Sequence, residues 1–413
     1  MRQIIRRLFK QPSAAEAKDL ISPKDLISQL GIGGLMKTAD DYYGNITDPT
    51  FHIAKPFYDV NEAPIALYNL GLLLGGMQLA PGMTVLDFGA GTCWLSRFIY
   101  QMRCPVICID PSATALKMGQ QLFDDYPVMG SPIGKPQFII FDGLTFEMPD
   151  SSVDRVVSFS AFHHVPNPEQ VLAEMFRVLK PGGIVGFVEP GMGHSSAPQS
   201  QLEMSYFKVL ENDIDLKTLV YTAQKLGFSS PRFRVCTNPI RDIYPDDYFE
   251  LHNHGKVPSK LTQALRNDTR QNYIFFFTKG VPVTDSRVPG GLHCKITTAV
   301  DKIITRAGET VRIPVHTLND GTALWLTKNA YDIGVVKVGT HLHTASGDLI
   351  DYSYTRTLFA EDIVPGQAVD IVLETQFVQE GQYTLLIDLV SEQVCWFERL
   401  GCTPLRVQVT VTG

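Results

Sequence analysis

Residues 84–96, TVLDFGAGTCWLS, decide the fold of the first half of the chain. The apolar, β-branched run at their start ends in Asp87 and predicts a strand. Gly89 and Gly91 follow, one residue apart, and predict a tight turn, because glycine adopts backbone conformations that other residues avoid. Trp94 opens a run of apolar residues at helical spacing. The stretch is therefore a strand, a glycine turn and a helix start, an arrangement that brings backbone close to a bound nucleotide.

The sequence of this turn also distinguishes between two classes of ligand. A dinucleotide fingerprint carries a third glycine three residues after the second, where the helix must pack closely above the pyrophosphate. Here that position is Trp94. The pattern therefore argues against a nicotinamide dinucleotide and favours a nucleoside cofactor that has no phosphate.

Predicted strands and helices alternate after this motif, which indicates an α/β domain with a parallel sheet covered on both faces. We expect a doubly wound, Rossmann-like sheet of seven strands. The further strands are predicted at 105–110, 136–143, 154–162, 184–190, 231–238 and 272–280, and the helices at 62–80, 112–125 (capped by Ser112), 168–180 and about 201–227. An insertion from residue 240 separates the last two strands and is predicted to form a lid or a substrate wall.

The pattern changes near residue 283. Residues 283–292 are rich in Pro and Gly and predict a linker, and residues 293–413 show short alternating strands with turns at intervals of roughly ten residues. We therefore predict four parts: a leader and cap (1–60), the α/β domain (61–282), the linker, and an all-β sandwich (293–413).

Composition excludes several classes of protein. A net charge of −7 argues against a broad nucleic-acid footprint. There is no apolar run of 18 residues that would span a membrane, and no secretory signal is evident. The seven cysteines lack CxxC or zinc spacing, so we expect reduced thiols, no metal site and a cytoplasmic location.

The first ten residues alternate basic and apolar side chains. They predict either a short amphipathic helix on anionic lipid or on a polysaccharide-assembly partner, which would place the protein peripherally at the inner membrane, or a frayed terminus. The sequence leaves the oligomeric state open.

Acidic and hydroxyl side chains stand at the ends of several predicted strands, which is where open α/β sheets bind ligands. Asp110 lies roughly 20 residues past the glycines, where a carboxylate accepts the two ribose hydroxyls of a nucleoside.

The segments DFGAGT, CIDPS, FDG, SFSAFHHV and RVLKPGG occur in this order over roughly residues 80–190. This set resembles the class I S-adenosylmethionine (SAM) methyltransferases, in particular those of the ubiquinone/menaquinone-biosynthesis type. The resemblance implies SAM as cofactor, with Asp87 at its methionine end, Asp110 on the ribose, Asp142 and Gly143 at the adenine edge, and Ser160 beneath the sulfur. The predicted cofactor-binding residues are Asp87, Phe88, Gly89, Ala90, Gly91, Thr92, Asp110, Pro111, Asp142, Gly143 and Ser160.

Methyl transfer to an alcohol requires alignment and removal of the hydroxyl proton. His163 and His164 follow the fourth predicted strand, and Glu189 opens the polar loop EPGMGHSSAPQS, which contains His194. We predict these four as catalytic candidates, with His194 as the preferred base. The loop suits a hydroxyl-rich ligand, although it also reads as an ordinary flexible connection. The acids of the following helix, Glu203 and Glu211 among them, either bind sugar hydroxyls or face solvent.

The C-terminal strands are similar to immunoglobulin-like modules of bacterial polysaccharide enzymes and of O-antigen ABC transporters. Trp325 and Trp396 either stack on sugar rings or pack in the core. We therefore predict an enzyme that O-methylates a sugar of a bacterial surface polysaccharide or its lipid-linked precursor, with that glycan as partner. The alternatives are methylation of a small metabolite or quinone-like lipid beside a purely structural sandwich, and a non-catalytic SAM-fold binding partner in polysaccharide assembly.

Overall fold

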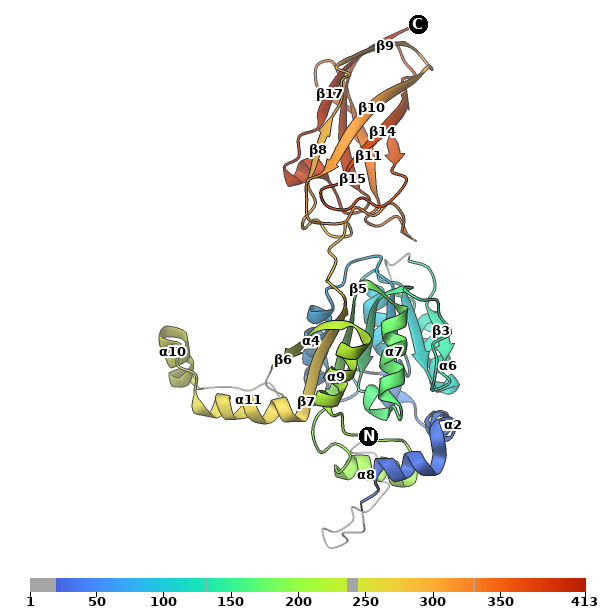
Figure 1. The fold of residues 1–413 in the computed structure, drawn as a ribbon, viewed down its shortest axis with the longest axis vertical. Helices are drawn as coiled ribbons and strands as arrows, with labels where there is room; N and C mark the ends of the chain where they lie inside the picture. Colours follow the sequence, from blue (N-terminus) through green and yellow to red (C-terminus); the bar gives the residue numbers. More distant parts are fainter. Residues whose placement is uncertain (1–19, 129, 131–132, 236–243, 330) are drawn as a thin grey trace. The chain divides into compact units, whose positions relative to one another are not determined.

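The computed structural model describes residues 20–128, 130, 133–235, 244–329 and 331–413 (Figure 1). The chain divides into two compact units. The first runs to Leu79 and continues over Met83–Pro282, and the second comprises Ala80–Gly82 and Val283–Gly413. Each unit has its own buried apolar core. The predicted basic amphipathic segment at residues 1–10 lies outside the described residues.

The first unit is built on the predicted seven-stranded sheet, with strand order β3-β2-β1-β4-β5-β7-β6. Strands β1 to β5 run parallel, and β7 is antiparallel to both β5 and β6. The strands are β1 (Val85–Phe88), β2 (Val106–Asp110), β3 (Gln137–Ile140), β4 (Val153–Phe159), β5 (Leu179–Pro190), β6 (Phe228–Arg234) and β7 (Asn272–Lys279). The carboxyl ends of β1 to β5 therefore meet at one edge of the sheet.

Helices cover this sheet as the apolar spacing predicts. The apolar stripe of α7 is buried against it, and Ser112 caps α6 by accepting a hydrogen bond from the Ala115 amide at 3.0 Å. The described helices that precede β5 are α2 (Pro23–Gly44), α3 (Thr50–Ile53), α4 (Ala63–Met77), α5 (Trp94–Gln101), α6 (Ala113–Asp125), η1 (Phe162–His164) and α7 (Pro168–Val178).

Two segments differ from the predicted elements. The stretch predicted as one helix over about 201–227 forms two, α8 (Pro198–Tyr206) and α9 (Leu216–Leu226), with an irregular segment between them. The side chain of Asp215 caps α9 by accepting from the amides of Lys217 and Thr218. The insertion after β6 carries α10 (Pro245–His254) and α11 (Ser259–Gln271), and Figure 1 shows the two helices extending away from the sheet.

The second unit is all β, as predicted. A three-stranded sheet, β14-β10-β8, and a larger sheet, β12-β11-β15-β17-β9, contribute to one apolar core. The elements are β8 (Cys294–Thr297), β9 (Lys302–Arg306), β10 (Thr310–Asn319), β11 (Val336–Thr344), β12 (Leu349–Asp351), β13 (Arg356–Leu358), β14 (Ala368–Gln376), β15 (Gly381–Ser391), β16 (Cys395–Trp396), η2 (Phe397–Leu400) and β17 (Leu405–Thr412).

Three residues refine the predictions for this unit. Within the predicted linker, Ser286 is fully buried, donates a hydrogen bond to the Gly334 carbonyl at 2.6 Å and accepts one from the Leu326 amide, so this part of the predicted linker is packed into the β unit. Trp325 is fully buried and Trp396 is 6% exposed. Both tryptophans belong to the interior, so neither presents a ring face on which a sugar could stack. No helix in the described part of the chain is long and apolar enough to cross a bilayer.

Candidate active site

A cavity of about 670 Å³ lies at the carboxyl ends of the parallel strands of the first unit. Its wall combines groups from β1, β2 and β5 and from the segment that follows β4 with α2, α3 and α8, as expected for a ligand site of an open α/β sheet. From α11, Gln271 alone reaches the wall, and none of α10 does. The insertion therefore adds little to the cavity that the structure describes, and the predicted lid is not seen there.

The glycine turn forms one end of this wall. Gly89 and Gly91 adopt φ values of +71° and +52°, which residues other than glycine rarely adopt. A Cβ atom on Gly89 would lie 2.2 Å from the Cβ of Ala161, so the turn closes against the segment after β4. Gly89 and the neighbouring Phe88 line the cavity. The turn thus brings its backbone to the wall of the cavity.

Asp110 ties this turn to the end of β2. Its two carboxylate oxygens accept hydrogen bonds of 2.8 Å from the amides of Gly91 and Ser112, and burial raises its pKa to about 6. Asp110 and Pro111 also line the cavity. The carboxylate is therefore held rigidly at the position predicted to receive ribose hydroxyls.

The remaining predicted cofactor residues are spread more widely. Ser160 lines the cavity, with a positive φ of 51°. Asp87 is not among the lining residues. It is buried, accepts a hydrogen bond from Ser96 at 2.6 Å, and has a pKa that burial raises to about 7. Asp142 is exposed and caps its own turn through the amides of Leu144 and Thr145.

Three small predicted residues support the site from beside it. Gly143 makes room for α2, since a Cβ there would lie 2.4 Å from Ile32. Ala90 and Thr92 are buried, and the Thr92 hydroxyl donates to the His52 carbonyl at 2.8 Å.

Helices α2 and α3 form a cap over the glycine turn. The Tyr43 hydroxyl lies 2.9 Å from the position that a Cβ on Gly91 would take. Asp40 fixes α2 to α6 by accepting from the Ser112 hydroxyl at 2.8 Å and the Thr114 amide at 2.9 Å. Lys55, another lining residue, has a pKa that burial lowers to about 8.

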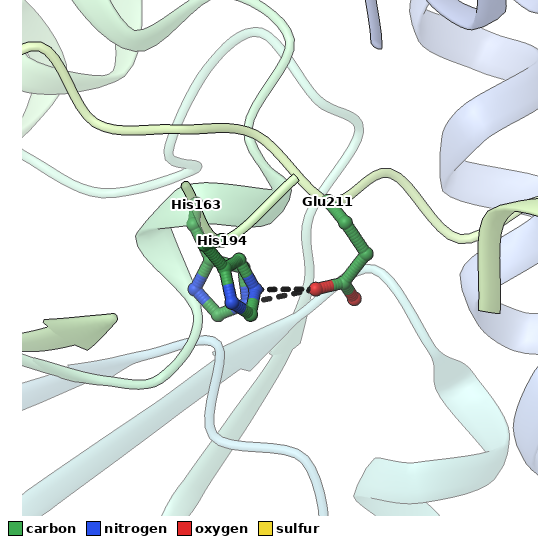
Figure 2. Close-up of side chains that lie close together, drawn as sticks. All are labelled: His163, His194 and Glu211. Carbon is green, nitrogen blue, oxygen red and sulfur yellow. Dashed lines mark hydrogen bonds and ion pairs between the residues drawn. The ribbon is translucent and has the colours of Figure 1, made fainter. Parts of the chain in front are cut away.

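Opposite this cap, His163, His194 and Glu211 converge on the wall of the cavity (Figure 2). The Glu211 oxygen Oε2 lies 2.5 Å from His194 Nε2 and 3.7 Å from His163 Nε2. Burial tends to raise the pKa of Glu211, but the charges of His164, His163 and His194 and the hydrogen bond with His194 outweigh it and lower the pKa to about 2. A charged carboxylate therefore faces both imidazole rings.

Glu189 determines how His163 is presented. This buried carboxylate lies 2.7 Å from the His163 ring nitrogen Nδ1. It also accepts hydrogen bonds from the Phe162 amide at 2.9 Å and from the Ser158 hydroxyl at 3.1 Å. Burial opposes ionisation, but the hydrogen bond and charge of His163 hold the pKa of Glu189 below its usual range. An ionised carboxylate only accepts hydrogen bonds, so Nδ1 carries the hydrogen and Nε2 keeps its lone pair.

Burial and the neighbouring His164 lower the pKa of His163, so its ring is neutral near pH 7. The two histidines therefore differ. The lone-pair nitrogen of His163 is Nε2, which lies 3.7 Å from Glu211 Oε2, whereas Nε2 of His194 lies 2.5 Å from the same oxygen, so the lone pair of His194 is on Nδ1. His194 Nδ1 lies 3.5 Å from the Ser200 hydroxyl.

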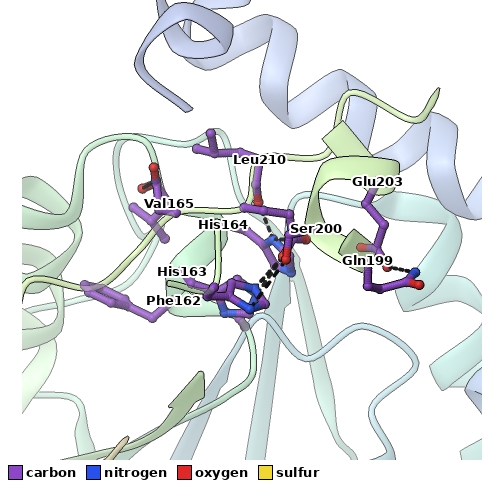
Figure 3. Close-up of polar contacts among 12 residues, drawn as sticks. Phe162, His163, His164, Val165, Gln199, Ser200, Glu203 and Leu210 are labelled. Atoms are coloured by element: carbon purple, nitrogen blue, oxygen red, sulfur yellow. Dashed lines mark hydrogen bonds and ion pairs between the residues drawn. The ribbon is translucent and has the colours of Figure 1, made fainter. Parts of the chain in front are cut away.

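Two further charged groups complete this wall (Figure 3). His164 places Nδ1 2.6 Å from the Leu210 carbonyl. Its pKa rises because the charge of Glu211 outweighs the effect of burial. Burial and the charge of Glu211 raise the pKa of Glu203 to about 7. The wall thus combines neutral and charged acid–base groups within one enclosed space.

The four predicted catalytic candidates therefore lie together, but Glu211 is as central as any of them. The sequence singled it out as an acid of the following helix that either binds sugar hydroxyls or faces solvent, and not as a catalytic candidate. Its partner His194 lies 17 positions before it, and no local spacing links the two. The contact depends on the irregular segment between α8 and α9, which places Glu211 at the cavity.

The chain is similar in sequence to known methyltransferases. Residues 86–187 match a family model described as a methyltransferase domain. Phosphoethanolamine N-methyltransferase 2 of Caenorhabditis elegans is 26% identical over 205 residues, which are 48% of this chain and 45% of that protein. Demethylmenaquinone methyltransferase of Renibacterium salmoninarum is 29% identical over 150 residues, 35% of this chain and 59% of that protein.

Among solved structures, a geranyl diphosphate methyltransferase in complex with GPP and sinefungin has a TM-score of 0.43 at 13% identity, covering 59% of this chain and 99% of that one. The chain spans about half the length of the curated relatives it matches. Within residues 86–187, the chain contains a class I methyltransferase domain, whose cofactor is S-adenosylmethionine.

Proposed function

We propose that this protein is an enzyme that transfers a methyl group from SAM to a hydroxyl of a bacterial surface polysaccharide or of its lipid-linked precursor. One observation carries the proposal: His163, oriented by the buried carboxylate of Glu189, presents a lone-pair nitrogen beside the cavity into which the glycine turn opens. The activity combines a nucleoside site and an acid–base site in one enclosed space.

The residues at the strand ends fit the cofactor. Backbone at Gly89 approaches the cavity without a side chain, and the Asp110 carboxylate offers an acceptor for vicinal ribose hydroxyls. Tyr43 supplies an aromatic cover over the turn. SAM supplies a methyl group on a cationic sulfonium, which is already activated as a leaving group.

The chain then has to align the acceptor and remove its proton. Holding the two reactants in the geometry of the reaction lowers the activation barrier by roughly 7–11 kcal/mol, and a positioned base raises the rate by roughly a further 10²–10⁴-fold. His163 Nε2 takes the acceptor proton in this scheme. The carboxylates of Glu189 and Glu211 stabilise the imidazolium that forms, in the way that an acidic partner supports a catalytic histidine. His194 and His164 position Glu211 and the acceptor.

Support for a glycan acceptor comes from the polar wall and from the attached β unit. His194, Gln199, Ser200 and Glu203 offer several hydrogen-bonding groups to a hydroxyl-rich ligand. The β unit is proposed to be immunoglobulin-like and to bind the glycan away from its two buried tryptophans. The described cysteines form no disulfide, which fits the proposed cytoplasmic location, with the basic N-terminus as peripheral contact at the inner membrane.

The matched relatives favour a second acceptor class. They include enzymes named for phosphoethanolamine, for demethylmenaquinone and for sterols, none of which is a polysaccharide. Methylation of a small metabolite or quinone-like lipid, with a structural β unit, is therefore the second candidate function. A non-catalytic binding role in polysaccharide assembly is the third.

The test uses the full chain with methyl-labelled SAM and three acceptors: a bacterial lipid-linked glycan fraction, demethylmenaquinone and phosphoethanolamine. Calorimetry with SAM and with S-adenosylhomocysteine first establishes cofactor binding. Alkali-stable label in the glycan fraction, lost in His163→Gln with cofactor affinity retained, supports the proposal. Label confined to the quinone or the amine replaces it with the second function. Cofactor binding without transfer to any acceptor favours the third, and absence of cofactor binding refutes both enzymatic functions.

A further inference from the structure

Three acidic and imidazole side chains converge in the β unit, remote in sequence from the methyltransferase domain. In the antiparallel pair β11 and β15, Asp388 stands opposite Gly339. His341 follows Gly339 by two residues, so it projects from the same face of the sheet as Asp388. The short helix η2 brings Glu398 to this face. The ligand atoms of the three side chains all lie within 4.8 Å of one another.

His341 is held with one ring nitrogen toward the other two residues. The side chain is 1% exposed, and Nδ1 lies 2.7 Å from the Tyr352 carbonyl oxygen. Because a carbonyl only accepts, Nδ1 carries the hydrogen and Nε2 keeps its lone pair. Nε2 has no hydrogen-bond partner within the described ranges and lies 3.8 Å from Glu398 Oε1. The ring packs between Tyr352 and Trp396, at centroid distances of 4.4 Å and 4.0 Å.

Asp388 presents a second buried acceptor to the same space. It is fully buried, and its Oδ2 accepts a hydrogen bond from the Glu398 amide at 2.9 Å. Its Oδ1 finds no hydrogen-bond donor among the residues that the structure describes. A buried acceptor left without a donor costs about 1–3 kcal/mol, and this cluster contains two such atoms, His341 Nε2 and Asp388 Oδ1.

The nearby cations are committed elsewhere. Arg356 Nε donates to Glu392 at 3.1 Å, and its guanidinium lies over the Trp396 ring. Arg399 donates to the Tyr352 hydroxyl at 3.1 Å. Gly339 allows this packing, since a Cβ there would lie 2.7 Å from the Trp396 ring. The cluster thus brings together two carboxyl groups and a lone-pair nitrogen, all of which can serve as ligands of a divalent cation.

We propose that His341, Asp388 and Glu398 bind one divalent transition-metal ion of the Zn²⁺ class. A mixed set of imidazole nitrogen and carboxylate oxygen suits such ions rather than Ca²⁺ or Mg²⁺, which take oxygen ligands. A ligating histidine whose other nitrogen donates to a backbone carbonyl is the usual supporting arrangement. The ion would tie η2 to strands β11 and β15 and stabilise the β unit. It takes no part in the proposed methyl transfer.

The experiment compares variants of the full chain after metal is removed with a chelator. ZnCl₂ is titrated by calorimetry into wild type, His341→Asn and Asp388→Asn. The matched control is His343→Asn, on the same strand, whose Nδ1 lies 3.1 Å from the Gly347 carbonyl and which has no part in the cluster. We expect wild type and the control to bind one more equivalent of zinc than the two cluster variants. Zinc at 100-fold its dissociation constant should raise the melting temperature of the β unit by roughly 5 °C or more in wild type and the control alone.

Equal zinc stoichiometry in all four proteins would overturn the proposal. The proposal would also be overturned if the metal-free Asp388→Asn chain were more stable than the wild-type chain with zinc. Asp388 and His341 would then share only a proton or a water molecule. Should either buried variant fail to fold, Glu398→Gln replaces it, since Glu398 is partly exposed. The titration is independent of SAM binding, so each proposal can fail while the other stands.

Discussion

Replacing Asp110 by Asn tests the assignment of the ribose site most directly, because cofactor affinity is measurable without knowledge of the acceptor. The carboxylate is 7% exposed and already accepts two backbone hydrogen bonds, from Gly91 and Ser112. Hydrogen bonds to ribose hydroxyls would use its remaining lone pairs. The amide keeps one acceptor oxygen and removes the charge.

The expected loss follows from this geometry. One hydrogen bond to a charged group contributes about 1.5–3 kcal/mol, and each 1.4 kcal/mol is tenfold, so the dissociation constant for SAM should rise about 10- to 150-fold. Calorimetry with SAM and with S-adenosylhomocysteine measures it. Asp124→Asn, on the exposed side of α6, is the matched control and should leave affinity unchanged.

A second comparison separates contact with the ribose from support of the turn. The 2′-deoxy form of S-adenosylhomocysteine should bind wild type more weakly, but Asp110→Asn should hardly distinguish it from the parent compound. If the two losses simply add, Asp110 acts only through the glycine turn, and the reasoning that places the ribose beside it is refuted.

Three further results are expected. Glu189→Gln presents an amide N–H to His163 Nδ1 and so reverses the tautomer of the ring. The rate of methyl transfer should fall by about 10²–10⁴-fold, while SAM affinity stays within about twofold of wild type. Unchanged turnover would exclude His163 as the base. The pKa of His163 is lowered, so the neutral base persists as pH falls, and kcat/KM should stay flat down to about pH 6.5 and decline only below it; a decline beginning above pH 7 would contradict this. Gly89→Ala forces a Cβ to within 2.2 Å of Ala161 and should reduce the free energy of unfolding, measured in urea, by about 2–4 kcal/mol. Gly193 also has a positive φ but has open space beside it, so Gly193→Ala should reduce the free energy of unfolding by only about 1 kcal/mol. Equal losses would show that the clash at Gly89 is relieved.

The α/β core was predictable from sequence because its signals are local. The apolar stripe of α7 and the cap at Ser112 each lie within one element, and the structure confirms them. Residues at the ends of parallel strands also converge without further information, because the topology brings those ends to one edge. Asp110, Ser160 and His163 therefore lie around the cavity as the strand pattern predicted.

The segment after α8 was not predictable in this way. Residues 207–215 contain no proline or glycine to end a helix, so the periodic pattern appeared continuous from 201 to 227. In the structure, Leu210 is 2% exposed and packs with Leu26 and Leu35 of α2. This contact between distant parts of the chain overrides local helix propensity. It also delivers the next residue, Glu211, to the cavity.

That displacement decides which nitrogen of His194 keeps its lone pair. From sequence, His194 was preferred because it lies in a polar loop, and nothing local indicated that a carboxylate would occupy its Nε2. In the structure, Glu211 lies 2.5 Å from His194 Nε2, whereas Glu189 engages only Nδ1 of His163. A base needs a nitrogen with an unshared pair facing the acceptor, and the partner of the other nitrogen decides which one that is. The nitrogen that each ring can offer as a base therefore depends on two carboxylates, each brought to its histidine by the fold rather than by spacing in the sequence.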